Sequence, residues 1–319
     1  MSRAVRFSRY GGPEVLEIVQ VPKPSPGPGQ VLVRAIVAPI NPGEIGIREG
    51  AFADIWPASF PEGQGNDFAG QVVEVGVGVT GFSAGDEVIG YAPRRAQADY
   101  VVHDADTLAR KPPAVCWEEA APLSAVGVTA WAGVDAVNPQ LGQVVVVSAA
   151  AGGVGVLAAQ LARLRGATVI GTVGPRNVDF VRSLGIIPVL HGPGLAERIR
   201  QVAPSGVDAL IDTFGDGHVA TAIALGVSPQ RINTIADRAA VRRYGVHDRA
   251  QEDAFSPRLV ERLATMVADK RLLVPISAVY PLEQVGQAYV ELAERHTRGK
   301  IVLSLVLDAD TRARPIEEH

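Results

Sequence analysis

Residues 144–160 read VVVVSAAAGGVGVLAAQ. The run of valines predicts a buried strand, the small residues after it predict a tight turn, and the stretch that follows predicts a helix. A second apolar strand is expected at 167–173, ATVIGTV. In a strand–turn–helix–strand unit, the N-terminus of the helix presents unpaired N–H groups and a partial positive charge, which together bind a pyrophosphate. The stretch therefore predicts a parallel sheet with a dinucleotide site at one of its edges.

The turn departs from the usual G-x-G-x-x-G pattern at its first glycine, where this chain has Ala150. Alanine can make the same tight turn if its φ stays negative, so Ala150 weakens the pattern without excluding a dinucleotide. Gly152 would let a phosphate approach the backbone, and Gly155 would let the helix pack closely on the strand. We expect the turn to contact the pyrophosphate through Ala150, Gly152, Gly153, Val154 and Gly155. A tight turn without a ligand is the alternative.

The end of the second strand predicts which dinucleotide binds. An NAD site usually has Asp or Glu there for the ribose 2′-hydroxyl, but residues 171–177 read GTVGPRN and contain no acid. Arg176 can bind a 2′-phosphate as a charged fork, with Thr172 and Asn177 as neighbouring contacts. We therefore expect NADP(H) rather than NAD(H), the alternative being that Arg176 is an ordinary surface residue.

The rest of the chain falls into two parts with different sequence patterns. Short strands bounded by Gly and Pro dominate the first part and predict a mostly β domain; they are expected at 15–21, 31–38, 70–82, 85–91 and 97–110. After a helix expected at 117–134, strands and helices alternate, as in a parallel sheet covered on both faces. The further strands are expected at 208–214 and 231–237, and a helix at 256–272. Residues 275–306 would supply a strand, a helix and a closing strand, and the charged residues 308–319 are expected to be frayed.

Composition excludes several classes of protein. The chain has 319 residues, of which 47% are hydrophobic and 20% charged, and its formal net charge is -4. Without a basic block, nucleic acid is not expected as a partner. The N-terminus lacks an apolar signal region, and the run at 144–162 contains too many glycines and polar residues for a membrane span. The single cysteine, Cys116, excludes an internal disulfide framework and favours a cytoplasmic location.

Several ordered motifs together resemble a known family. They are GGPEVLEI (11–18), PGPGQVLVRAIVAPINPGE (26–44), GNDFAGQVVEVGVGV (65–79), FSAGDEVIG (82–90), AQADYVV (96–102), AAPLSAVGVTAW (120–131), AAAGGVG (149–155) and RGKIVL (298–303). From Arg3 to Leu307 the chain resembles the zinc-independent medium-chain dehydrogenase/reductases, in the quinone oxidoreductase and enoyl reductase branch. The resemblance implies an α/β protein: a GroES-like mostly β domain (1–120, completed by 276–319), a doubly wound Rossmann domain (121–275), a cleft where they meet, and a homodimer.

The residues of this chain do not match the zinc-binding branch of the superfamily. Catalytic zinc needs three Cys, His or acidic ligands. The zinc enzymes carry a His–Glu pair where this chain has Asn66 and Asp67, and a ligand cysteine where it has INPGE (40–44). Cys116 is expected to be buried, and the histidines lack metal spacing; they are His103, His191, His218, His247, His296 and His319. Without a metal to polarise an alcohol, we expect NADPH to reduce an already electrophilic small molecule.

The resemblance also implies roles for individual residues. Asn41 would lie beside the nicotinamide and the acceptor, and Thr129 near the nicotinamide and its ribose. Phe214 and Ile235 would follow the fourth and fifth strands of the Rossmann sheet and border the cofactor. Arg298 would reach the cofactor from the C-terminal strand. For Asn41, an ordinary turn residue before proline is the alternative.

Two departures from the family bear on the proton donor. Where many quinone reductases have tyrosine this chain has Gly46, and where enoyl reductases place a proton-donating tyrosine it has Phe52. A phenyl ring cannot donate a proton, which leaves water, a cofactor hydroxyl or Tyr91 as the donor, although Tyr91 can equally be a packing residue. The leading hypothesis is an NADPH-dependent reductase of quinones or α,β-unsaturated carbonyls. An enoyl-thioester reductase and a weakly catalytic NADPH-binding structural or sensor protein are the alternatives.

Overall fold

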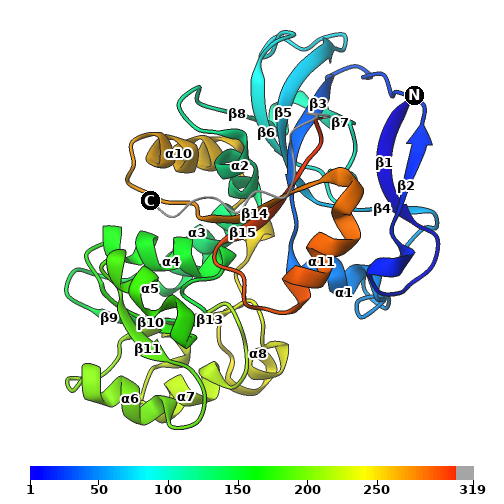
Figure 1. Cartoon of the computed structure of the whole chain (residues 1–319). Coiled ribbons are helices and arrows are strands. Elements are labelled where there is room, and N and C mark those ends of the chain that lie inside the picture. Colours follow the sequence, from blue (N-terminus) through cyan, green and yellow to red (C-terminus); the bar gives the residue numbers. More distant parts are fainter. Residues whose placement is uncertain (307–319) are drawn as a thin grey trace. The chain divides into compact units, whose positions relative to one another are not determined.

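The computed structural model describes residues 1–306, so the segment predicted to be frayed, 308–319, lies outside the described residues. The chain forms two compact units (Figure 1). Unit 1 comprises 1–125, 256–271 and the chain from 275 onward, and unit 2 comprises 126–255 and 272–274. The predicted domain limits differ from these units chiefly in the segment 256–271, which packs with unit 1.

Unit 1 is mostly β, as predicted. Its strands are β1 (Ser2–Phe7), β2 (Glu17–Val21), β3 (Gln30–Pro39), β4 (Glu62–Gly63), β5 (Asp67–Val75), β6 (Glu87–Tyr91), β7 (Tyr100–Asp104), β8 (Ala109–Arg110), β14 (Ile276–Pro281) and β15 (Lys300–Ser304). Its helices are α1 (Pro42–Arg48), α2 (Trp117–Ala120), α10 (Pro257–Ala268) and α11 (Val285–Ala293). One sheet has the order β2-β1-β4, and the larger one has the order β14-β15-β3-β5-β6-β8, with β7 paired to β3.

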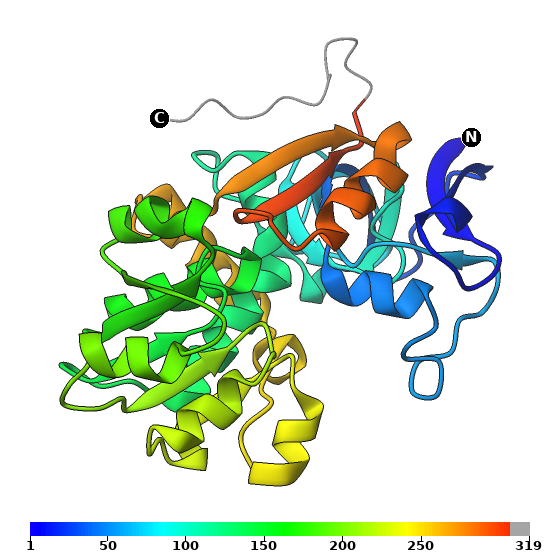
Figure 2. The same cartoon turned by 60° about the horizontal axis from the view of Figure 1, so that its bottom comes forward.

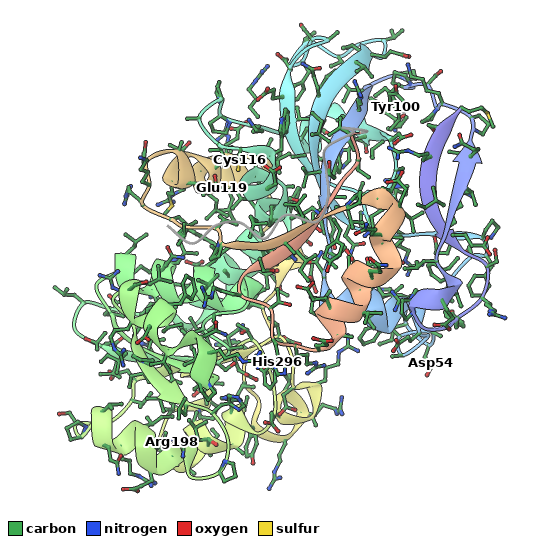
Figure 3. The ribbon with its side chains drawn as sticks, viewed as in Figure 1. Asp54, Tyr100, Cys116, Glu119, Arg198 and His296 are labelled. Carbon is green, nitrogen blue, oxygen red and sulfur yellow. The ribbon has the colours of Figure 1, made fainter. Side chains whose placement is uncertain are left out.

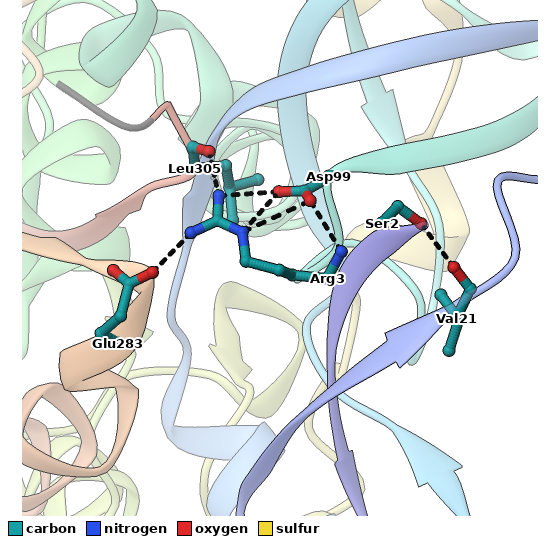
Figure 4. Close-up of polar contacts among 6 residues, drawn as sticks. All are labelled: Ser2, Arg3, Val21, Asp99, Glu283 and Leu305. Atoms are coloured by element: carbon teal, nitrogen blue, oxygen red, sulfur yellow. Dashed lines mark hydrogen bonds and ion pairs between the residues drawn. The ribbon is translucent and has the colours of Figure 1, made fainter.

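Both ends of the described chain build unit 1. The C-terminal strand β15 pairs antiparallel with β3, opposing Val302 to Pro39, so the predicted return to the first domain is present. Arg3 on β1 binds the Asp99 carboxylate through Nε and Nη2, and its Nη2 also donates to the Leu305 carbonyl at 2.7 Å (Figure 4). Its Nη1 binds Glu283, so one partly buried guanidinium ties the N-terminal strand to the C-terminal segment.

The long strand β3 lies at the centre of unit 1. Val31, Leu32 and Val33 on this strand are fully buried, because β3 is covered by neighbouring strands on both edges and by side chains on both faces. Helices α1 and α11 lie side by side in the views of Figures 1 and 2 and contact one another. This packing places the first turn of α1, which follows β3 directly, against the middle of α11.

Unit 2 is a parallel five-stranded sheet in the order β11-β10-β9-β12-β13. The strands are β9 (Val144–Val147), β10 (Thr168–Val173), β11 (Ile187–Leu190), β12 (Ala209–Asp212) and β13 (Ile232–Thr234). Its helices are α3 (Val126–Val137), α4 (Gly153–Leu164), α5 (Val178–Ser183), α6 (Leu195–Val202), α7 (His218–Ala224), α8 (Arg238–Tyr244) and α9 (Gln251–Ala254). The order reverses between β9 and β12, as in the doubly wound fold that the sequence predicts.

The structure departs from the sequence-based expectation at several elements, among them β1, α1, α6 and α8, which the sequence pattern did not predict. Strand β11 is not predicted by the pattern because it is four residues long and contains Pro188, which a sheet tolerates at its edge. The helix expected at 117–134 is broken at 121–124, where a 3-10 turn contains Pro122. The chain enters unit 2 shortly afterwards, at residue 126. Among the described residues no single helix is long and apolar enough to cross a membrane, although the consecutive helices at 117–124 and 126–137 reach that composition as a pair.

Candidate active site

The predicted dinucleotide turn in unit 2 connects β9 to α4. Gly152 caps α4 with extended backbone, at φ -79° and ψ 174°, so the helix begins at Gly153. The positive φ in this turn falls on Ala149, at 46°, and not on Ala150, so alanine stands at the first glycine position without left-handed strain. Ala150 is buried and its N–H donates to the Thr172 carbonyl at 3.0 Å. The turn thus leads directly into the N-terminus of α4, and its contact with a pyrophosphate stays a prediction.

Two glycines are needed here for close packing. A Cβ on Gly155 would lie 2.2 Å from the carbonyl oxygen of Ala149, so only glycine lets α4 start this close to the turn. A Cβ on Gly171, in β10, would lie 2.6 Å from the Cβ of Ala150. Gly171 therefore accommodates the alanine that replaces the first glycine of the pattern.

Thr172 lies behind the turn. Its side chain is almost fully buried, and its Oγ1 accepts the N–H of Ala149 at 3.2 Å and contacts Nε2 of His218 at 3.2 Å. His218 Nδ1 faces the Gly215 carbonyl, which can only accept, so Nδ1 carries a proton. Thr172 supports the turn from inside the sheet, and its predicted contact with the cofactor remains a prediction. His218 carries no role in the sequence-based interpretation, which examined the histidines only for metal spacing.

A buried carboxylate joins the ends of β9, β12 and β13. Asp212 Oδ1 accepts from the Ser148 hydroxyl at 2.6 Å and from the N–H groups of Phe214 and Gly215 at 3.2 and 3.0 Å. Its Oδ2 accepts from the Thr234 hydroxyl at 2.7 Å. Asp212 thereby fixes the loop that carries Phe214, and Ile235 follows β13 and is partly exposed. Phe214 and Ile235 follow the fourth and fifth strands as predicted, at the same sheet edge as the dinucleotide turn.

The loop after β10 carries the predicted cofactor-selecting residues. Arg176 is exposed in a 3-10 turn from Pro175 to Asn177, and no acid stands at the tip of the strand. His191, at the end of the neighbouring β11, lies beside this loop: a Cβ on Gly174 would lie 3.8 Å from its Nε2. The sequence-based interpretation missed His191 because it did not predict β11. Thr129 lies in α3, partly buried and also in unit 2.

In unit 1, Asn41 follows β3 and caps α1 within a group of charged residues. Its Nδ2 donates to Oε1 of Glu44 at 3.1 Å and to Oδ1 of Asp67 at 2.7 Å. Its Oδ1 accepts from Nζ of Lys300 at 2.8 Å, and its backbone N–H donates to Oε2 of Glu44 at 3.0 Å. We call Asn41, Glu44, Asp67 and Lys300 the Asn41 cluster.

The sheet brings the Asn41 cluster together. Strands β15, β3 and β5 are neighbours, and Lys300 begins β15 where Asn41 follows β3 and Asp67 begins β5. Lys300 also donates to the carbonyl of Ile40, which anchors the ammonium beside the strand end. The three side chains therefore meet at one edge of the sheet, although 259 residues separate Asn41 from Lys300.

Burial shifts the pKa of every charged member of the Asn41 cluster. Desolvation raises the pKa of Asp67 to about 7. The positive charge of Lys300 opposes this increase, and the negative charge of Glu44 reinforces it. Desolvation also raises the pKa of Glu44, against its hydrogen bonds from Tyr289 and Asn41, and lowers the pKa of Lys300, against both carboxylates. Oδ2 of Asp67 is buried and has no hydrogen-bond partner among the described residues. One of the two carboxylates is therefore incompletely satisfied.

Tyr289 on α11 closes the cluster from the side of α1. Its hydroxyl donates to Oε2 of Glu44 at 2.6 Å and accepts from Nε2 of Gln64 and of Gln97, each at 2.8 Å. Burial and the adjacent Glu44 raise the pKa of Tyr289 well above its usual value. The hydroxyl is fully occupied by structural bonds, so Tyr289 holds Glu44 in place.

The remaining predicted site residues of unit 1 lie near the Asn41 cluster, through strand pairing or along the chain. Tyr91 ends β6, opposite Asp67 in the β5–β6 pairing, and is partly buried. A Cβ on Gly46 would lie 2.6 Å from the ring of Phe52, so the two departures from the family are coupled: the phenyl ring fills the space that a side chain at 46 would need. Arg298 precedes Lys300 by two residues in unit 1 and is partly buried.

Cys116 is exposed, so its predicted burial is wrong. It is the N-cap residue of α2, and its Sγ donates to Oε2 of Glu119 at 3.3 Å (Figure 3). Partial desolvation, reinforced by the charges of Glu119 and Glu118, raises the pKa of Cys116 to about 12. A thiol held protonated in this way is a poor nucleophile and a poor metal ligand.

Comparison with known proteins extends these observations. Two family models match: the alcohol dehydrogenase GroES-like domain over residues 27–172 and the zinc-binding dehydrogenase domain over residues 190–303. A chloroplast envelope quinone oxidoreductase homolog of Arabidopsis thaliana is 30% identical over 95% of this chain and 98% of its own length. A mycocerosic acid synthase-like polyketide synthase of Mycobacterium tuberculosis is 29% identical over 92% of this chain, which matches 15% of that protein. A mycobacterial protein solved in complex with NADPH superposes with a TM-score of 0.84 at 26% identity, over 95% of this chain and 99% of the other.

The name of the second family model raises the question of zinc, and the residues present do not fit it. Within residues 1–306, no group of three His, Cys, Asp or Glu side chains is arranged to hold a metal ion. At the turn where zinc enzymes carry a ligand cysteine, Oδ1 of Asn41 is bound to the ammonium of Lys300. A second cation there would meet the positive charge of Lys300 and a donor set without cysteine or histidine.

Proposed function

Because the chain belongs to the quinone oxidoreductase branch of the medium-chain dehydrogenase/reductase superfamily, we propose that it reduces quinones or α,β-unsaturated carbonyl compounds with NADPH and without a metal. The observation that carries the proposal is the Asn41 cluster. A protein ammonium, bound to the amide oxygen of Asn41 and the carbonyl oxygen of Ile40, stands at the turn where zinc enzymes place a ligand. The reaction left to such a site is transfer of a hydride to an acceptor that is already electrophilic.

The chain's own residues would bind, orient and exclude water. The turn at 149–155 would hold the pyrophosphate through the free N–H groups at the start of α4. NADPH supplies the hydride when it is bound. A quinone takes up that hydride and a proton to become a hydroquinone, and an enone takes up the hydride at its β-carbon and the proton at its α-carbon. Phe52 cannot supply this proton, so the proposal assigns it to water, a cofactor hydroxyl or Tyr91.

The preference for NADPH is supported by the loop after β10. Arg176 is exposed there, His191 lies beside the same loop, and no carboxylate stands at the strand tip to repel a 2′-phosphate. The structural neighbour solved with NADPH supports the same assignment. We also propose that the protein acts as a homodimer in the cytoplasm, and light scattering of the purified protein tests the first of these.

The test measures oxidation of NADPH and of NADH by 1,4-benzoquinone, by a cyclic enone and by an enoyl thioester. We expect NADPH oxidation by the quinone or the enone. Arg176→Ala should lower kcat/KM for NADPH about 10- to 100-fold, the usual effect of losing a charged hydrogen-bond donor, and leave NADH unchanged. Arg182→Ala is the matched control, since Arg182 is an exposed arginine of unit 2 whose partner is Asp179. A wild-type preference for NADH would contradict the cofactor assignment.

A second candidate is reduction of enoyl thioesters. It is favoured by the match to the polyketide synthase over most of this chain, and oxidation of NADPH by the thioester alone would support it. NADPH binding without oxidation by any acceptor would instead favour a binding protein. In that case the ring of Phe52 over Gly46 would be the first feature to change, by Phe52→Tyr.

A further inference from the structure

The side-chain amide of Asn41 has almost no hydrogen-bonding capacity left. An asparagine amide has two N–H donors and an oxygen with two lone pairs. Both N–H groups are taken by carboxylates, at 3.1 Å to Glu44 and 2.7 Å to Asp67, and one lone pair is taken by Lys300 at 2.8 Å. The N–H of Glu44 is bound by the backbone carbonyl of Asn41. What remains on this partly exposed residue is one lone pair of Oδ1.

Charge fixes the orientation of this amide. In the opposite orientation the NH₂ group would face the ammonium of Lys300, and the oxygen would face the carboxylates of Glu44 and Asp67. Each of these three contacts would turn from attractive to repulsive in a buried environment, where electrostatic interactions are strong. The orientation therefore depends on having a cation on one side and carboxylates on the other.

Lys300 is the member of this arrangement that nothing else in the cluster can replace. Among the described residues it is the one cation bound to Asn41, it is buried, and its ammonium is anchored by the carbonyl of Ile40, just after β3. The other charged and titratable groups that face the amide or its partners are Glu44 on α1, Asp67 on β5 and Tyr289 on α11. Arg48 on α1 is also buried; it lies over the ring of Tyr289 and interacts with the charge of Glu44, but it makes no hydrogen bond to Asn41. Without Lys300, the oxygen side of the amide loses its partner and Asp67 loses its counter-charge, whereas Glu44 keeps the more distant charge of Arg48.

We propose that Lys300 is a positioning residue for the reaction. It holds the Asn41 amide in one orientation, in which the only group that Asn41 presents to a ligand is a hydrogen-bond acceptor, Oδ1. The turn therefore binds an N–H or O–H group of the ligand and not a carbonyl oxygen. This inference rests on the proposed function. Under it, Asn41 does not polarise the carbonyl group of the acceptor. It binds a donor such as the hydroxyl of a reduced acceptor or the carboxamide N–H of the nicotinamide.

The first test measures hydrogen exchange of the Asn41 side-chain amide directly and does not depend on catalytic turnover. The chain has five asparagines, so protein labelled with ¹⁵N-asparagine gives few side-chain amide signals, and Asn41→Asp identifies the pair from residue 41. We expect this pair to exchange slowly with solvent in the wild type and in Lys300→Arg, and at least tenfold faster in Lys300→Met. Lys111→Met is the matched control, because Lys111 is also buried in unit 1 and paired, at 2.8 Å to Glu87. It should leave the amide signals of Asn41 unchanged.

The second test measures ligand binding and catalytic turnover. Two ligand pairs that differ in their donors are compared as inhibitors: 1,4-hydroquinone with 1,4-dimethoxybenzene, and NADP⁺ with its 3-acetylpyridine analogue. The wild type should bind the donor-bearing member of at least one pair tenfold or more tightly, and Lys300→Met should lose that difference. Lys300→Met should also lower kcat at least tenfold and move the pH profile upward, because loss of the ammonium further favours protonation of Asp67. Lys300→Arg should restore most of kcat.

Each outcome decides between the proposals. If Lys300→Met lowers the melting temperature as Lys111→Met does but keeps the wild-type amide exchange and pH profile, Lys300 is only structural and the inference fails. If the wild type discriminates neither ligand pair, the acceptor-only turn is wrong. If the wild type oxidises no NADPH with any acceptor, the proposed function fails, while the amide signals still decide whether Lys300 positions Asn41.

Discussion

Asp212 in unit 2 and Asp67 in unit 1 are both fully buried aspartates at strand ends, and they are satisfied in opposite ways. Asp212 receives two hydroxyl and two backbone N–H donors, from Ser148, Thr234, Phe214 and Gly215. Asp67 receives one side-chain donor, from Asn41, and its Oδ2 is left without a partner among the described residues. Neutral dipoles stabilise the first carboxylate, whereas the second depends on the charge of Lys300.

This difference separates a scaffold from a titratable site. A carboxylate surrounded by fixed donors connects β9, β12 and β13 and keeps the predicted cofactor-binding loops in register. A carboxylate that relies on another buried charge responds to pH and to any substitution among its partners. Unit 2 should therefore lose stability when its carboxylate is removed, and unit 1 should change its protonation when its partners are altered.

The largest expected effect comes from removing the fully bonded carboxylate. Asp212→Ala leaves two backbone N–H groups and two hydroxyls without their acceptor, and should lower the free energy of unfolding of unit 2 by about 4 kcal/mol. Urea unfolding followed by Trp131 fluorescence measures this in a background of Trp56→Phe and Trp117→Phe, which lie in unit 1. Ser148→Ala, which removes a single donor, should cost only about 1 kcal/mol. A loss below 1 kcal/mol for Asp212→Ala would show that Asp212 does not organise the sheet edge.

The next effect is a pH dependence confined to unit 1. The pKa of Asp67 is raised from 3.8 to about 7 in the folded protein, so the folded state binds this proton more tightly than the unfolded state. The resulting stability is present below pH 4 and is lost as the pH rises toward 7 and above it. Asp67→Asn lacks this titration, so from pH 5 to pH 8 its stability should rise relative to the wild type by about 2.5 kcal/mol. Unfolding curves of unit 1 at both pH values, read from Trp56 and Trp117 in Trp131→Phe, provide the measurement.

The reverse sign would overturn this interpretation. If Asp67→Asn lost stability relative to the wild type on going from pH 5 to pH 8, the wild-type carboxylate would have to be favoured in the folded state. Lys300 would then outweigh burial. A flat difference between the two proteins would mean that the proton resides elsewhere in the Asn41 cluster. Glu44→Gln, measured in the same way, would then show the pH dependence.

The fold followed from local patterns more readily than the sites did. The strand, turn and helix around residues 144–160 are encoded by consecutive apolar and small residues, so the sequence alone predicted them. Strand β11 was missed because a short edge strand containing Pro188 has no such pattern. The motif RGKIVL was recognised without a role for Lys300, because its meaning depends on the pairing of β15 with β3. Contacts across 259 residues leave no periodic trace in the sequence.

The dinucleotide turn shows the same limit on a smaller scale. The motif drew attention to Ala150, because that is where the pattern lacks glycine. The backbone strain lies one residue earlier, at Ala149, whose φ of 46° is rare for a residue with a side chain. The pattern reports which residue usually stands at a position, and the actual φ is set by how the turn packs on Gly155 and Thr172.

The smallest predicted effect is a change in the free energy of unfolding that has opposite signs for glycine substitutions at Ala149 and at Ala150. Ala149→Gly relieves a left-handed conformation and should raise the free energy of unfolding of unit 2 by about 0.5 to 1 kcal/mol, after the entropy that glycine adds to the unfolded chain. Ala150→Gly removes a buried methyl from a residue with ordinary φ and should lower it by about 1 to 2 kcal/mol. The same urea unfolding read from Trp131 compares them. If both substitutions destabilise, the left-handed conformation at Ala149 costs less than the entropy that glycine adds to the unfolded chain.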